Sequence, residues 1–206
     1  MDLSDVTFYF DYEDAENAYN EYLERHIRNT IKSWTDVLLP TLQENPNVCE
    51  QLEDICEVEV DDGYLKFVGK QISYHDESKY DEDEYIAYRN NFYPTCEADL
   101  NEYNQKQYDL AWLRHIHLNK HHPQHWLLQR DSGECERLDM DLEFVLEMLC
   151  DWHSFSAIYP DSTAYKWYTD NKDSILISER TAEIVELLIP FMKDKSLYDL
   201  KQMGNY

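Results

Sequence analysis

Basic side chains are scarce in this sequence. Only 18 lysines and arginines stand against 43 aspartates and glutamates in 206 residues, which gives a formal net charge of −25 at pH 7. Such a field repels nucleic-acid backbones and anionic membrane surfaces at long range, so direct binding of DNA or RNA is not expected. The charge permits a basic protein partner, or a small anionic substrate held by bound cations that locally invert the field.

Paired cysteines and long apolar runs are also missing. The five cysteines are odd in number, irregularly spaced and without a CxxC pair, which favours reduced thiols over a disulfide framework or a structural zinc ribbon. The N-terminal residues are acidic and do not resemble a signal peptide. The longest apolar stretch near the C-terminus, residues 184–192, contains Glu186 and Pro190 and is far shorter than the roughly 20 residues that span a bilayer. We therefore expect a soluble, cytoplasmic protein with no membrane segment.

Aromatic and apolar residues are plentiful and follow helical spacing. Seven Phe, five Trp and seventeen Tyr argue against disorder. Periodicity of 3.6 residues predicts helices over residues 15–39, 64–74, 98–119 and 141–152, with a last helix from Ser178. The expected fold is therefore all-α, a single helical domain over residues 15–206.

Three segments outside these helices are expected to be irregular. Residues 1–14 alternate apolar and polar side chains and predict a short extended N-terminal arm. Pro40 is expected to end the first long helix, and residues 40–63 predict a surface insertion with one helical turn. Residues 129–140 are polar and predict a loop that covers a site.

The adjacent pair His75-Asp76 places an imidazole and a carboxylate where one metal ion can use both. His26 lies on the apolar stripe of the first helix, and Asp151 lies on a late helix. Nitrogen and carboxylate oxygen suit a first-row divalent ion such as Mn, Fe, Co, Ni or Zn. The alternative for His26 is a core histidine bonded to a neighbour, which is the commoner role of a lone histidine.

The order His26, His75-Asp76, Asp151 on separate helices resembles the HD superfamily of metal-dependent phosphohydrolases. The segments HDESKY, AWLRHIHLNKHHPQHW, EMLCDW and WYTDNKDSILIS also resemble an uncharacterised family of bacterial and phage proteins of unknown function, over about residues 20–190. The resemblance implies an HD-like helical bundle in which those four residues hold a metal. It also implies that Lys79, in an HDxSK pattern, binds a substrate phosphate; the alternative for Lys79 is a surface lysine paired with an acidic neighbour.

Five of the eight histidines fall within residues 115–125. Dinuclear HD enzymes recruit additional histidines in this part of the chain, so the resemblance implies a second metal held by His121 or His122. Which of His115, His117, His121 and His122 face the site is left open. His125 and His153 are expected to be structural.

The function that the resemblance implies is hydrolysis of a small phosphorylated molecule, a nucleotide or nucleotide second messenger. One or two transition-metal ions would activate water, with Asp76 and Lys79 as catalytic residues. Lys79, Arg114 and Lys120 would offset the charge of the phosphate. The alternative is an acidic interaction protein, such as a DNA mimic or phage-encoded inhibitor, on an HD-like scaffold without turnover. The oligomeric state is left open.

Overall fold

The computed structural model describes residues 7–9 and 11–203, and within them the prediction of an all-α fold is confirmed. The one sheet in these residues is an antiparallel hairpin of β1 (Leu127–Gln129) and β2 (Cys135–Arg137). Part of the predicted N-terminal arm, residues 1–6 and 10, lies outside the described residues, and residues 7–9 have no regular structure. Among the described helices, none is both long and apolar enough to cross a membrane. The five cysteines all lie in the described part and are free.

The chain divides into two compact units. Unit 1 comprises Met1–Arg25 and Asp76–Asn119, and unit 2 comprises His26–His75 and Lys120–Tyr206. Each unit therefore combines two separate stretches of sequence, and one unit boundary falls between His75 and Asp76. The single domain expected from the sequence stays a prediction.

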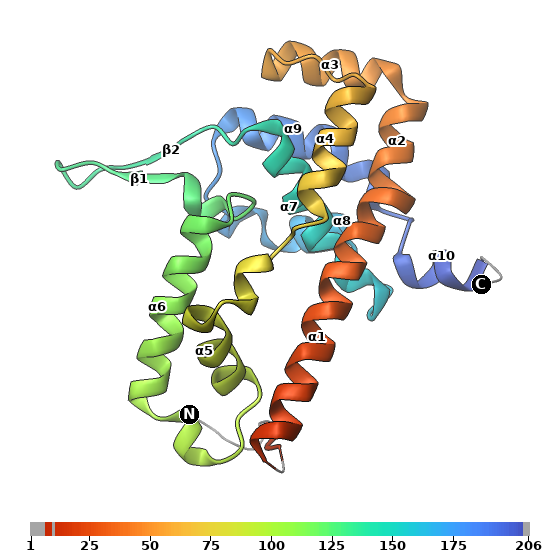
Figure 1. Cartoon of the computed structure of the whole chain (residues 1–206). Coiled ribbons are helices and arrows are strands. Elements are labelled where there is room, and N and C mark those ends of the chain that lie inside the picture. The colour runs from red at the N-terminus through yellow and green to blue at the C-terminus, as the bar shows by residue number, and fades with distance from the viewer. Residues whose placement is uncertain (1–6, 10, 204–206) are drawn as a thin grey trace. The chain divides into compact units, whose positions relative to one another are not determined.

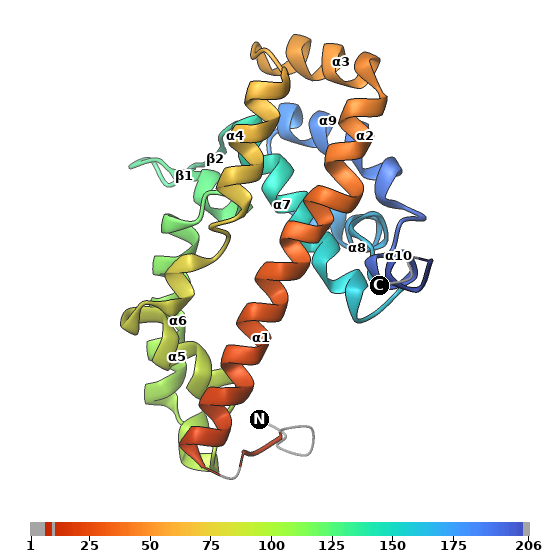
Figure 2. The same cartoon turned by 45° about the vertical axis from the view of Figure 1, so that its right-hand side comes forward.

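Unit 1 is built around a cluster of aromatic side chains. Its elements are residues 12–25 of α1 (Tyr12–Lys32), the 3-10 turns η2 (Glu77–Tyr80) and η3 (Glu97–Leu100), and the helices α5 (Glu82–Phe92) and α6 (Glu102–Leu118). Helices α5 and α6 lie side by side (Figures 1 and 2). Tyr19 and Leu23 of α1 pack with Tyr88 of α5 and Ala111 of α6.

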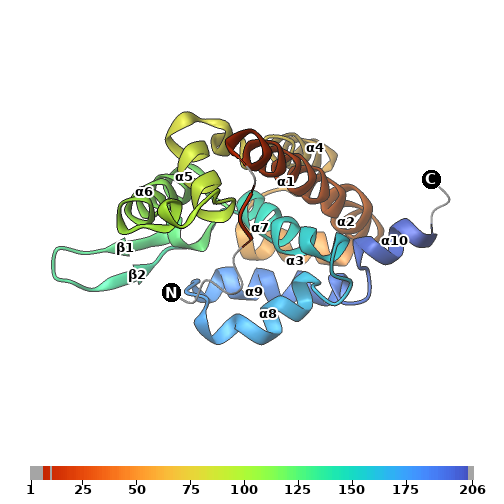
Figure 3. The same cartoon turned by 90° about the horizontal axis from the view of Figure 1, so that it is seen from below.

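Unit 2 contains the main apolar core, with α7 (Leu142–Ser154) at its centre. It also contains residues 26–32 of α1, the π-helical turn η1 (Ser33–Leu38), α2 (Leu39–Glu44), α3 (Pro46–Cys56), α4 (Asp62–Ile72), η4 (Pro123–Trp126), β1, β2, η5 (Phe155–Ala157), α8 (Ala164–Asn171), η6 (Lys172–Ser174), α9 (Glu179–Leu188), η7 (Ile189–Met192) and α10 (Leu197–Met203). Helices α8 and α9 pack on one side of α7 (Figure 3), and η1 and α4 also contact it. Because α7 is surrounded, nearly all of its apolar side chains are buried, as expected of a helix at the centre of a core.

Two local predictions are corrected by the structure. Residues 40–63 are not an irregular insertion, because α2 and α3 occupy most of them and bury Val48, Leu52 and Cys56. These three residues are spaced by four, so they form one apolar stripe on α3. Pro40 does not end the helical path either. It lies in the first turn of α2, directly after the π-helical turn η1, so the helical path continues past it.

Residues 129–140, predicted to be a loop, include the last residue of β1 and all of β2. The hairpin extends away from the helices of its unit (Figures 1 and 3). Gly133 at its turn has φ 90°, a left-handed conformation that glycine adopts without steric cost. The predicted role of this segment as a cover over a site is not tested by these features.

Candidate metal centre

Three predicted ligands meet inside unit 2. His26 comes from α1, His75 follows the end of α4, and Asp151 comes from α7. His26 Nε2 lies 3.3 Å from His75 Nε2, and Asp151 Oδ1 lies 3.1 Å from His26 Nε2 and 3.6 Å from His75 Nε2. Donor atoms bound at about 2.1 Å to one ion are themselves about 3–3.4 Å apart. The three side chains are buried or nearly so, and they could hold a metal ion.

Glu147 fixes the orientation of His75. His75 Nδ1 lies 2.9 Å from Glu147 Oε1. Burial raises the pKa of Glu147, but hydrogen bonds from His121 and His75 outweigh burial and lower the pKa to about 2. An ionised carboxylate only accepts hydrogen bonds, so His75 carries its proton on Nδ1 and in its neutral form has its lone pair on Nε2. A carboxylate behind a histidine is the usual support of a metal-binding imidazole.

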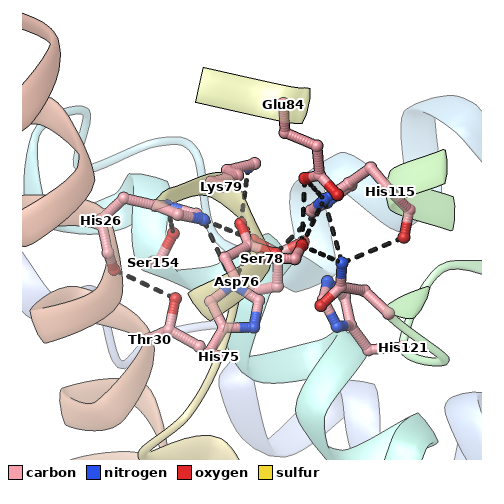
Figure 4. A network of polar contacts seen from close by, with 12 residues as sticks. His26, Thr30, His75, Asp76, Ser78, Lys79, Glu84, His115, His121 and Ser154 are labelled. Atoms are coloured by element: carbon pink, nitrogen blue, oxygen red, sulfur yellow. Dashed lines mark hydrogen bonds and ion pairs between the residues drawn. The ribbon is translucent and has the colours of Figure 1, made fainter. Parts of the chain in front are cut away.

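Ser154 gives His26 a partner that can reverse its role. Ser154 Oγ lies 3.2 Å from His26 Nδ1 (Figure 4), and a hydroxyl can donate or accept. With a metal ion on Nε2, His26 would donate from Nδ1 to Ser154. Without the ion, His26 can donate from Nε2 to Asp151 and accept from Ser154. The hydrogen bonds of His26 are therefore satisfied in both states.

Asp151 brings a negative charge into the buried centre. Burial raises the pKa of Asp151, but hydrogen bonds with His26 and His75 outweigh burial and hold it well below its usual value. An ionised carboxylate therefore lies beside two imidazole Nε2 atoms that point at each other. Lone pairs at such distances repel one another unless a proton or a metal ion lies among them.

Helix α7 supplies one side of the centre through a regular pattern. Glu147, Asp151 and Ser154 are spaced at i, i+4 and i+7, which places them on one helical face. Asp151 is predicted from the sequence, whereas Glu147 and Ser154 are not. A signal was available, since Glu147 and Asp151 are two acidic residues one turn apart in a helix rich in apolar residues.

The histidine-rich segment divides between buried and exposed positions. His121 is buried in unit 2, and its Nδ1 lies 3.1 Å from Glu147 Oε1. His122 is half-buried, with its ring centroid 4.3 Å from that of His121. His117 is exposed and His125 lies against Trp126. The second metal ion expected from His121 or His122 stays a prediction. The contact between His121 Nδ1 and Glu147 supports it, because a proton on Nδ1 leaves the lone pair of the neutral ring on Nε2, where an ion could bind.

Asp76 is held within unit 1. Lys79 Nζ lies 2.5 Å from its Oδ2, and His115 Nε2 lies 3.3 Å from its Oδ1 (Figure 4). The backbone of Asp76 has φ 57°, a left-handed conformation that costs a non-glycine residue about 1–3 kcal/mol and recurs at functional sites. The role of Asp76 as a fourth ligand stays a prediction.

His115 and Glu84 are buried residues that support Asp76. His115 Nδ1 lies 2.8 Å from Glu84 Oε2, and both side chains are fully buried. Burial lowers the pKa of His115, but hydrogen bonds with Asp76 and Glu84 outweigh burial and raise it. His115 therefore lies between two carboxylates, and its contacts with them help to fix the position of the Asp76 side chain.

The other predicted phosphate-binding residues lie elsewhere. Arg114 donates to Glu84 Oε1 at 2.6 Å and to Asp81 Oδ2 at 2.9 Å, so its guanidinium is committed to carboxylates of unit 1. Lys120, in unit 2, is exposed and lies 5.1 Å from the centre of the Phe144 ring. Lys79 is likewise paired with Asp76, so the binding of a phosphate by Lys79, Arg114 or Lys120 stays a prediction.

One comparison with known proteins gives a match. The model of a family of unknown function (DUF5662) matches residues 15–190, which is most of the chain. Comparisons with curated proteins and with solved structures give no match.

Proposed function

The chain belongs to this family of unknown function, and from that premise we propose that it is a metal-dependent phosphohydrolase with an HD-like site, acting on a small phosphorylated molecule. The observation that carries the proposal is the convergence of His26 Nε2, His75 Nε2 and Asp151 Oδ1. Two imidazoles and a carboxylate suit Mn, Fe, Co, Ni or Zn. Three protein ligands leave coordination positions for water and substrate, as in catalytic sites.

The ion and several other side chains of the chain have separate roles in this proposal. When bound, the ion supplies an activated water for attack on phosphorus. Glu147 holds the Nδ1 proton of His75, which keeps Nε2 directed at the centre. Lys79 offsets the negative charge of the phosphate, and His115 holds Asp76, the ion-pair partner of Lys79.

Phosphate release tests the proposed reaction. Untagged protein supplied with Mn, Co or Ni should release phosphate from at least one member of a panel of small phosphorylated molecules. His26→Ala should abolish the release and Lys79→Ala should lower it. His117→Ala, at an exposed histidine, is the matched control and should leave the rate unchanged. If no metal supports release from any member of the panel, the proposed reaction is wrong.

A second candidate function is an acidic interaction protein that imitates DNA. The observation that favours it is the net charge of −25, with exposed carboxylates such as those of Asp81 and Asp83. It predicts that the protein displaces duplex DNA from a DNA-binding protein, that salt weakens the effect, and that His75→Ala does not change it. The proposal of a phosphohydrolase predicts that the protein does not displace DNA.

A further inference from the structure

A groove of about 550 Å³ lies between α5 and α6 in unit 1. The two helices lie side by side (Figures 1 and 2), and each contributes one face to the groove. On α6 the lining residues are spaced at i, i+4, i+7 and i+11 and therefore share a face: Tyr103, Gln107, Leu110 and Arg114. On α5 the lining residues include Ile86.

Three apolar side chains are exposed in this groove. Ile86 is 44% exposed, Leu110 is 58% exposed and Tyr103 is 68% exposed. Single exposed apolar residues are normal on a protein surface, whereas several that form one patch mark an interaction site. All three line the same groove, so they form such a patch. A partner that covers them would remove apolar surface from water.

The groove is acidic where α5 begins. Glu82 and Asp83 line it, and Asp81 and Glu84 flank them in the sequence. Arg114 is the only cation among the described residues that line the groove, and it is paired with Asp81 and Glu84. Four carboxylates against one guanidinium leave this end negative, which favours basic side chains in a partner. A second copy of the chain, with its own net charge of −25, would be repelled.

The walls of the groove favour a helical partner. Both walls are helices, and the backbone groups inside a helix are bonded to one another. An extended segment laid between them would leave its own N–H and C=O groups without backbone partners, whereas a helix satisfies these groups internally. At 1.5 Å per residue, the wall from Tyr103 to Arg114 is about 17 Å long, which matches about three turns of a partner helix.

We propose that this groove binds a basic amphipathic helix of a partner protein. Apolar side chains at i, i+3, i+4 and i+7 of that helix would cover Ile86, Tyr103 and Leu110. Its lysines or arginines would pair with Glu82 and Asp83. The proposal does not depend on the phosphohydrolase, because the residues that line the groove do not include the three ligands of the metal centre.

Two peptides that differ only in residue order test this recognition. Both carry fluorescein, have about 14 residues and contain leucine and lysine in equal numbers. One has its leucines on a single helical face, and the other has them spread around the helix. Fluorescence anisotropy with the full chain in EDTA, at about 0.15 M salt, should show at least about tenfold tighter binding of the amphipathic peptide. Equal affinity for the two peptides would show attraction by charge alone, as a DNA mimic would give, and overturn the proposal.

Removal of one apolar side chain locates the binding. Leu110→Ser should weaken binding of the amphipathic peptide by about five- to tenfold, because it removes apolar surface that the peptide covers. Leu113→Ser is the matched control, since Leu113 is exposed on the same helix but does not line the groove, and it should leave the affinity unchanged. Thermal unfolding followed by circular dichroism checks that both variants are folded. Equal affinities in these two variants would overturn the proposal.

Removal of one carboxylate tests the acidic end of the groove. Glu82→Gln should weaken binding of the amphipathic peptide by about two- to threefold. Glu183→Gln, at an exposed residue of α9 in unit 2, changes the net charge equally and should leave the affinity unchanged. Equal affinities in Glu82→Gln and Glu183→Gln would contradict the pairing of the peptide with this end of the groove.

A second copy of the chain is the other possible occupant, and analytical ultracentrifugation without peptide tests it. A monomer supports the proposal, because the groove is then open to a partner. A wild-type dimer that Leu110→Ser dissociates, and Leu113→Ser does not, would assign the groove to self-association and overturn the proposal.

Discussion

Glu147 is the residue that connects His75 of the metal centre with His121, because its Oε1 accepts from both. Glu147→Gln removes the negative charge and keeps one oxygen. Loss of a carboxylate behind a metal-binding histidine typically lowers metal affinity by about 10- to 100-fold, and we expect an effect of that size. Isothermal titration with Zn or Mn measures it.

Glu183→Gln provides the control for that experiment. Glu183 is an exposed carboxylate on α9 of the same unit, and its loss should leave metal affinity within about twofold. Equal affinity for wild type and Glu147→Gln would show that Glu147 has no part in metal binding.

His153 makes a pH-dependent contribution to stability. Its Nε2 donates to the Lys195 carbonyl and its Nδ1 accepts from Ala164 N–H, so the expected structural role fits its surroundings. Burial lowers the pKa of His153 to about 4, although the bond to Lys195 opposes the shift. Between pH 6.5 and 4 the unfolded chain therefore binds the extra proton, and stability falls as pH falls through that window. The total is about 3 kcal/mol, complete above pH 6.5.

The measurement is urea unfolding in EDTA at a series of pH values. Between pH 4 and 6.5, His153→Gln should reduce the slope of the unfolding free energy against pH. The reduction should be at most the amount that corresponds to one proton taken up on unfolding. The same substitution at exposed His117 should leave the slope close to that of wild type. A His153→Gln slope equal to that of wild type would contradict this assignment.

At the scale of single residues, the sequence was most informative about the metal ligands, because their order along the chain could be compared with that of a known superfamily. His26, His75 and Asp151 were chosen from their order on separate helices, and the structure brings them together in unit 2. Glu147 was missed because a glutamate on a mostly apolar helix is usually a solvated residue, and its partners are known only from the structure. Arg114 was chosen for its charge, but its ion pairs with Asp81 and Glu84 depend on how α5 and α6 pack.

At the scale of elements, α4 contacts η1 through a close approach at Gly69. A Cβ atom at position 69 would lie 2.8 Å from Trp34 Nε1, in a buried indole. Gly69→Ala gains about 1 kcal/mol of helix propensity, but overpacking of this kind costs about 1–3 kcal/mol. We expect a net loss of about 1 kcal/mol in the free energy of unfolding, measured with urea. Lys66→Ala, exposed on the same helix, should cost less than about 0.5 kcal/mol, and a Gly69→Ala protein as stable as wild type would contradict this packing.

The helices were predictable where apolar periodicity extends over several turns. Helices α1, α4, α6, α7 and α9 all overlap predicted segments. Residues 40–63 were misassigned because Pro46, Asn45 and Asn47 signal a loop, whereas the stripe of Val48, Leu52 and Cys56 is short. Tertiary burial against the core of unit 2 stabilises α3 more than local propensity does.

At the scale of the whole molecule, the scarcity of basic residues restricts where an anionic substrate could bind. The field of a chain with net charge −25 opposes anions except where local cations invert it. A metal at the centre of unit 2 and Lys79 in unit 1 would be two such cations. The all-α class could be predicted because apolar residues recur at helical spacing in most segments of the sequence. The reaction could not be predicted, because it depends on which side chains come together in the folded chain and on whether they bind a metal ion.

The most direct test of the account is the metal content of untagged protein, measured by inductively coupled plasma mass spectrometry after purification and dialysis. We predict at least one transition-metal ion per chain in wild type, its loss in His75→Ala and Asp151→Ala, and its retention in His117→Ala, with circular dichroism confirming that all variants are folded. A wild type that binds no metal, or a His75→Ala variant that retains it, would contradict the metal centre.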